Sequence, residues 1–185
     1  MQRTLGLLTV VFTLATIETA LAQPGVTTEQ HKVLKNEVGD WEAEMKLYPQ
    51  GPDGPTIDGK CEETSRVLNN GMWLISDFKG DFAGFPFEGH GTFGYNPQKK
   101  KYVGTWVDNM NPALTLMEGD YDAKAKTLTM YSEGTDPETG KPMKTKNVTQ
   151  YLEDGRRIFT MSNQAPGSDK YIKMMELTYT KKKGK

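Results

Sequence analysis

The sequence predicts an all-β protein, a single antiparallel up-and-down barrel of about ten strands preceded by a short helix. Aromatic residues and glycines recur at alternate positions over residues 85–96 and again over residues 101–108, which is the period of a β-strand. Further segments of this kind follow along the chain, and most are separated by a turn signal of hairpin length. Such short connections favour a meander that closes into a barrel over a Greek-key sandwich.

The first 22 residues have the pattern of a secretory signal peptide. A lone Arg3 precedes an apolar run over residues 5–17, and Ala20-Leu21-Ala22 supplies small residues for cleavage before Gln23. An uncleaved anchor or a buried helix is the competing interpretation, but the run is short and rich in threonine for a span of ~20 residues. We therefore expect a secreted or periplasmic protein with no membrane span after signal removal.

The remaining chain has the length of one domain. We expect a flexible lead over residues 23–30, a barrel domain over residues 31–181 and a basic tail over residues 182–185. The whole sequence has 23 Lys and Arg against 24 Asp and Glu, and this balance argues against a nucleic-acid partner. Cys61 is the only cysteine, so no internal disulfide can form and the core alone must hold the fold.

The helix is predicted just before the first strand. Thr27 and Gln30 have the spacing of a capping box, Val33 and Leu34 lie on one face with Val38, and Gly39 can end the helix. Apolar and polar residues then alternate cleanly from position 41, and a loop rich in proline and glycine follows at residues 49–55. The strands are predicted at residues 41–48, 58–68, 71–79, 86–95, 101–109, 113–121, 126–133, 142–152, 156–163 and 170–181.

The junction of the helix and the first strand resembles a known barrel signature. Gly39-Asp40-Trp41 is similar to the GxW motif of lipocalins and related calycin barrels, which also follows a short helix. The resemblance implies that Gly39 and Trp41 belong to the barrel closure, with the tryptophan sealing one end and the helix acting as a plug.

A wider set of motifs runs along residues 31–181. It includes His31-x-x-Leu34, Pro86-Phe87-x-Gly89-x-Gly91, Gly94-Tyr95-Asn96, Trp106-x-Asp108-x-Met110 and Glu118-Gly119-x-Tyr121-Asp122. Together these motifs resemble a bacterial family known as domain of unknown function fifteen-seventy-nine. The resemblance implies a calycin-like barrel and an exported protein, and the family brings no established activity. The chain has Asn96 where the family pattern leads us to expect aspartate, and Lys181 where it leads us to expect arginine, the better partner for a floor tryptophan.

A barrel of this size either fills with its own side chains or holds one small ligand. We therefore expect a non-enzymatic binder of a small, largely apolar molecule or lipid. The ten methionines suit an adaptable interior, although ordinary core packing also explains them. The candidate ligand-binding residues are aromatic or polar side chains on predicted strands, namely Trp73, His90, Tyr95, Trp106, Asp108 and Glu118.

Two other functions are open at this stage. The first is an enzyme that acts on a lipid-like substrate with His90 and a carboxylate, and the second is a packed barrel that works through its surface. The sequence contains no nucleophile motif, so no catalytic residue is assigned. His31, Cys61 and His90 lie on separate elements without metal-ligand spacing, and there is no haem motif, so no metal or cofactor is predicted.

The glycines of the central hairpin have a packing interpretation. Gly89, Gly91, Gly94 and Gly104 recur on its two strands, and such positions permit sharp coiling or leave room for a bulky neighbour. We expect Trp106 and the nearby phenylalanines to occupy that room.

Overall fold

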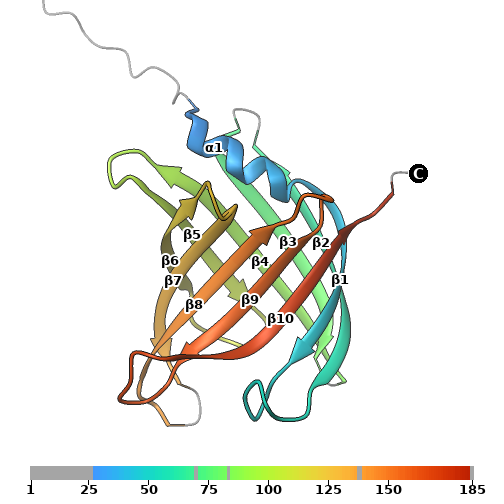
Figure 1. Ribbon diagram of the computed structural model, residues 1–185, viewed down its shortest axis with the longest axis vertical. Helices are drawn as coiled ribbons and strands as arrows, with labels where there is room; N and C mark the ends of the chain where they lie inside the picture. The colour runs from blue at the N-terminus through green and yellow to red at the C-terminus, as the bar shows by residue number, and fades with distance from the viewer. Residues whose placement is uncertain (1–26, 69–70, 83, 137–138, 184–185) are drawn as a thin grey trace, which may run out of the picture.

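The computed structural model describes residues 27–68, 71–82, 84–136 and 139–183, which fold into one closed antiparallel barrel (Figure 1). Each strand pairs with the next along the chain, and the first pairs with the last. This confirms the predicted fold class. The strands are β1 (Gly39–Leu47), β2 (Ile57–Val67), β3 (Trp73–Phe82), β4 (Phe85–Asn96), β5 (Lys101–Asp108), β6 (Thr115–Asp122), β7 (Thr127–Thr135), β8 (Pro142–Tyr151), β9 (Arg157–Gln164) and β10 (Tyr171–Lys181).

Every observed strand overlaps its predicted range, and the differences fall at the ends. The strand β3 begins two residues later than predicted, because Gly71 adopts a φ of 73° in a turn that the Leu68 N–H closes by donating to the Trp73 carbonyl oxygen (2.9 Å). The predicted signal segment, residues 1–22, lies outside the described residues.

The N-terminal helix lies across one end of the barrel (Figure 1). It consists of α1 (Glu29–Val33) and a 3₁₀ turn, η1 (Leu34–Glu37). The predicted cap is wrong by one residue: the helix begins after Thr28, whose backbone N–H donates to Nδ1 of His31 at 3.0 Å. Within the described ranges, no helix combines the length and apolar character needed to cross a bilayer.

The helix is held by buried contacts with the strands below it. Leu34 is 1% exposed and packs among Leu74, Tyr102 and Tyr151. The Tyr102 hydroxyl donates to the Gln30 carbonyl oxygen at 2.9 Å, so a strand side chain also satisfies the helix backbone. The helix thus covers this end of the barrel.

Alternation along the strands separates the barrel interior from solvent. In β1, Trp41, Ala43 and Met45 are buried while the residues between them are exposed. Similar alternation on the other strands gathers the apolar side chains inside. One buried cluster includes Phe78, Phe87, Met175 and Leu177, and a second, nearer the helix, includes Leu74, Met117, Leu128 and Met130.

Aromatic rings lie directly over the glycines of the β4–β5 hairpin, as the sequence predicted. A Cβ atom added at Gly89 would lie 2.2 Å from the Trp106 ring, and one added at Gly91 would lie 2.5 Å from the Phe93 ring. Gly94 faces outward, where the added atom would lie 2.6 Å from Trp73. The glycines therefore make room for aromatic side chains on both faces of the wall.

Trp41 is 2% exposed, and its indole N–H donates to the Glu37 carbonyl oxygen at 2.8 Å. We predict that Trp41→Ala lowers the free energy of unfolding by about 3–5 kcal/mol, as expected for a large aromatic deletion in a core. Chemical denaturation measures the loss, and Trp73→Ala, on the outer face, is the control that should cost clearly less. A Trp41→Ala loss below about 1 kcal/mol would contradict the closing role of this residue.

Gly91→Val is expected to lower the thermal midpoint despite the good strand propensity of valine, because the side chain meets the Phe93 and Trp106 rings. The control is Gly134→Val on β7, where an added Cβ atom has no neighbour within 4 Å among the described residues. Thermal melts should give a clearly lower midpoint for Gly91→Val than for Gly134→Val. A raised midpoint for Gly91→Val would show that the aromatic rings do not depend on the missing side chain.

Candidate functional site

The barrel encloses a cavity of about 650 Å³. It extends from Leu34 and Glu37 at the helix-covered end to Pro49 and Met110 in the loops at the opposite end. This volume falls within the range of ~300–1,000 Å³ that is usual for small-molecule sites. The barrel is therefore not filled by its own side chains, and the packed-barrel interpretation loses its basis.

One side of the cavity is an aromatic wall carried by β3, β4 and β5. Phe78 and Phe87 meet edge to face with ring centroids 5.8 Å apart, and Phe78 also contacts Trp106 at 6.3 Å. Edge-to-face packing fixes the rings and leaves a rigid apolar surface toward the cavity. Methionines from other strands extend this surface, including Met117, Met130, Met161 and Met175.

The other side is a wall of uncharged polar side chains on β7, β8 and β9. The Thr145 hydroxyl donates to Oδ1 of Asn163 at 3.0 Å, and the Asn147 amide contacts the sulfur of Met117 at 3.5 Å. In the closed strand order, β8 is five positions from β3 in either direction, so the polar wall lies opposite the aromatic wall. The residues concerned are Ser132, Thr145, Asn147, Thr149 and Asn163.

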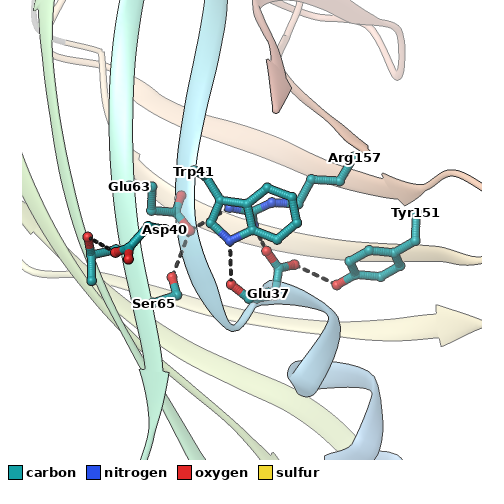
Figure 2. Close-up of polar contacts among 8 residues, drawn as sticks. Glu37, Asp40, Trp41, Glu63, Ser65, Tyr151 and Arg157 are labelled. Carbon is teal, nitrogen blue, oxygen red and sulfur yellow. Dashed lines mark hydrogen bonds and ion pairs between the residues drawn. The ribbon is translucent and has the colours of Figure 1, made fainter. Parts of the chain in front are cut away.

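Arg157 forms the centre of the floor, the helix-covered end of the cavity (Figure 2). It is 5% exposed and forms ion pairs with Glu37, through Nη1, and with Oε1 of Glu63, at 2.6 Å through Nη2. The guanidinium carbon lies 3.9 Å from the centroid of the Tyr179 ring and 4.7 Å from that of Trp41. Aromatic rings thus cover a single positive charge that pairs with two carboxylates.

The two carboxylates have further partners of their own. The Tyr151 hydroxyl donates to Oε1 of Glu37 at 2.6 Å, and the Ser65 hydroxyl donates to Oε1 of Glu63 at 2.7 Å (Figure 2). Glu37 ends the helix, whereas Tyr151 ends β8 and Arg157 begins β9. The network therefore joins the helix to strands from both halves of the chain.

Burial shifts the pKa values of these groups. It raises the pKa of the Glu63 carboxyl, although hydrogen bonds from Ser65, Tyr179 and Ser76 oppose the shift. Burial also lowers the pKa of the Arg157 guanidinium to about 10, which leaves it charged at neutral pH. The only guanidinium in the described cavity lining is thus already engaged by two carboxylates.

The comparisons place the chain in a family without an assigned role. The family model described as protein of unknown function (DUF1579) matches residues 26–181. The chain belongs to this family. The match spans the helix and every described strand of the DUF1579 barrel, so the cavity walls and the floor all lie within it. A search of curated proteins found no match.

Two of the candidate residues line the cavity of this DUF1579 barrel. Trp106 belongs to the aromatic wall, and its indole N–H donates to Oδ2 of Asp108 at 3.0 Å. Asp108 also accepts the backbone N–H groups of Met110 and Asn111, so this carboxylate fixes the loop at the end remote from the helix. Tyr95 lies under the helix, 5.8 Å from the His31 ring, and is not among the lining residues.

The structure places Trp73, His90 and Glu118 on the outer face of the barrel, which corrects the expectation that they line its interior. The aromatic positions of β4 face inward, so strict alternation turns His90 toward solvent, where its Nδ1 lies 2.7 Å from Oδ1 of Asp77. Trp73 and Glu118 border a groove on the outer surface, and Glu118 pairs there with Lys99.

The floor network was missed at the sequence level, although one signal was present. Arg157 alternates with Phe159 and Met161, so period two places the arginine on an apolar face. An arginine does stack on Trp41, but it is Arg157 of β9 and not the residue at position 181. Lys181 remains near the same ring, with Nζ 5.4 Å from its centroid.

The described residues offer little for metal or thiol chemistry. No group of three or more His, Cys, Asp or Glu side chains in these ranges is arranged to hold a metal ion. Cys61 is buried with its sulfur 4.0 Å from that of Met45, and burial raises the pKa of its thiol to about 11. The thiolate that a nucleophile would need is therefore disfavoured.

We predict that Arg157→Met lowers the free energy of unfolding by about 3–5 kcal/mol, because Glu37 and Glu63 then lie buried without a cation. The matched control is the neighbouring Arg156→Met, whose solvent-exposed ion pair with Asp154 should contribute much less to stability. Urea denaturation compares the two. Equal losses would contradict a special role for the buried arginine.

The destabilisation by Arg157→Met should also depend on pH. A carboxyl whose pKa is higher in the folded state contributes stability below its unfolded pKa and loses it as pH rises through the folded value. Removing the cation raises the pKa of Glu63 beyond the effect of burial. We therefore expect the difference in free energy of unfolding between the variant and the wild type to become smaller as pH falls from 8 to 5. A difference in free energy of unfolding that grows on acidification would contradict the raised pKa of Glu63 in the variant.

Proposed function

We propose that the chain is an exported, non-enzymatic protein that binds a small, largely apolar molecule inside its barrel. The observation that carries the proposal is the cavity of about 650 Å³ between the aromatic and polar walls. Aromatic and methionine side chains dominate its apolar surface, and such surfaces exclude water and accept varied apolar shapes. Export rests on the pattern of residues 1–22, and identification of the mature N-terminus would test it.

The enzyme alternative required His90 as a general base inside the cavity. His90 lies outside the barrel and is paired with Asp77, so it cannot act on a molecule in the cavity. The carboxylates of the described lining are committed elsewhere. Glu37 and Glu63 pair with Arg157, Asp108 holds a loop, and Glu133 pairs with Lys144. The binder is therefore the function that the geometry supports best.

We predict that the protein binds the uncharged dye N-phenyl-1-naphthylamine with saturation near one molecule per chain. The cavity supplies one enclosed apolar volume in which the fluorescence of the dye should rise. Fatty acids, fatty alcohols and fatty amides serve as competitors in the same titration. Absence of saturable binding across the dye and all three classes would overturn the proposed function.

A matched pair of variants on β7 locates the bound dye. Met130 faces the cavity, whereas its neighbour Tyr131 is 46% exposed on the outer surface. Met130→Trp should reduce the affinity for the dye about tenfold or more by filling the cavity, and Tyr131→Trp should leave it unchanged. Circular dichroism verifies that both variants fold. An equal effect of the two substitutions would place the dye outside the barrel.

A further inference from the structure

Three uncharged side chains form a row at one level of the polar wall. Backbone pairing places Ser132 of β7 opposite Thr145 of β8, and Thr145 opposite Asn163 of β9. All three line the cavity, and the Thr145 hydroxyl donates to Oδ1 of Asn163. We call Ser132, Thr145 and Asn163 the polar row.

The polar row has unused hydrogen-bonding capacity. Ser132 is only 8% exposed, and within the described ranges no protein group hydrogen-bonds to its hydroxyl. The bond from Thr145 occupies the oxygen of the Asn163 amide and leaves its NH₂ group available toward the cavity. Because these groups line the cavity and are not fully paired within the protein, they favour a ligand that can hydrogen-bond to them.

The charges of the lining disfavour an anionic ligand. Among the described lining residues, Arg157 is the only base, whereas four are acidic: Glu37, Glu63, Asp108 and Glu133. The arginine is covered by two rings and paired with two of these carboxylates. A ligand carboxylate would therefore lose its hydration and meet like charge without a free cation to offset either cost.

The strand order places the polar row on the opposite side of the cavity from the aromatic wall. The strand β8 lies opposite β3, and β9 lies opposite β4, which carry Phe78 and Phe87. An apolar body can thus rest on the aromatic rings while one polar group reaches across to the row. Hydroxyl and amide side chains supply both donors and acceptors, which suits a carbonyl, amide or hydroxyl group.

We propose that the cavity selects an uncharged amphiphile whose carbonyl, amide or hydroxyl group binds the polar row, and that it discriminates against carboxylates of the same chain length. This inference rests on the proposed function and specifies the class of its ligand.

The test compares three ligands that share a twelve-carbon chain and differ in the polar group. Dodecanamide, dodecanol and dodecanoate each displace N-phenyl-1-naphthylamine from the protein at pH 8. The amide and the alcohol should bind at least about tenfold more tightly than the carboxylate. Dodecylammonium completes the set and should also bind less tightly than the amide, because the lining carboxylates already have partners and the ammonium group would lose its hydration. Binding of dodecanoate or dodecylammonium as tight as that of the amide would overturn the inference.

Variants of the polar row assign the preference to particular side chains. The double variant Ser132→Ala with Thr145→Val is nearly isosteric and should reduce the advantage of the amide over the carboxylate to about threefold or less. The matched control, Thr160→Val with Ser162→Ala, changes the alternate, outward positions of β9 and should keep the full advantage. An advantage that survives in the polar-row variant would overturn the assignment to these side chains.

The design separates failure of this inference from failure of the proposed function. If the dye binds but dodecanoate displaces it as well as dodecanamide does, the cavity is a binding site and only the ligand class is wrong. If the dye and all four amphiphiles fail to bind, the proposed function itself fails. Binding of the dye to the polar-row variant provides the internal control for folding.

Discussion

The ion pairs of Arg157 with Glu37 and Glu63 are the constraint on which the rest of the barrel depends. They hold a charge that would be costly to bury alone, and they do so only if the helix, β2 and β9 meet at one point. Trp41 and Tyr179 then cover the guanidinium and seal this end against solvent. Because Arg157 is already paired with two carboxylates, the floor can support the cavity without acting as a receptor for an anion.

The fold could be predicted from the sequence because its main signals are local. Alternation in β1 and hairpin-length turns are visible within a few residues, and together they define a meander. The floor could not be predicted in this way. Arg157 and Glu63 lie 94 positions apart, and Tyr151 and Glu37 lie 114 positions apart, so no local pattern reports their contact.

The candidate site could be predicted from the sequence only in part, because a strand pattern does not say which face lies inside the barrel. Period two separates Glu88 and His90 from the aromatic positions of β4, but it cannot say which of these two faces lies inside. The glycines do not decide the question, since Gly94 faces outward beneath Trp73 whereas Gly91 faces inward beneath Phe93. Trp106 and Asp108 line the cavity because the large side chains of β5 lie on its inner face.

Closure of the barrel by β1 and β10 also has a kinetic consequence. Trp41 pairs with Lys181, so barrel closure joins the two ends of the folded region. Contacts of such long sequence separation slow folding, because the chain must lose much of its conformational freedom before they can form. Without β10, β1 and β9 present unpaired edges that can associate with other chains. The last strand is therefore required to protect both of these edges from aggregation.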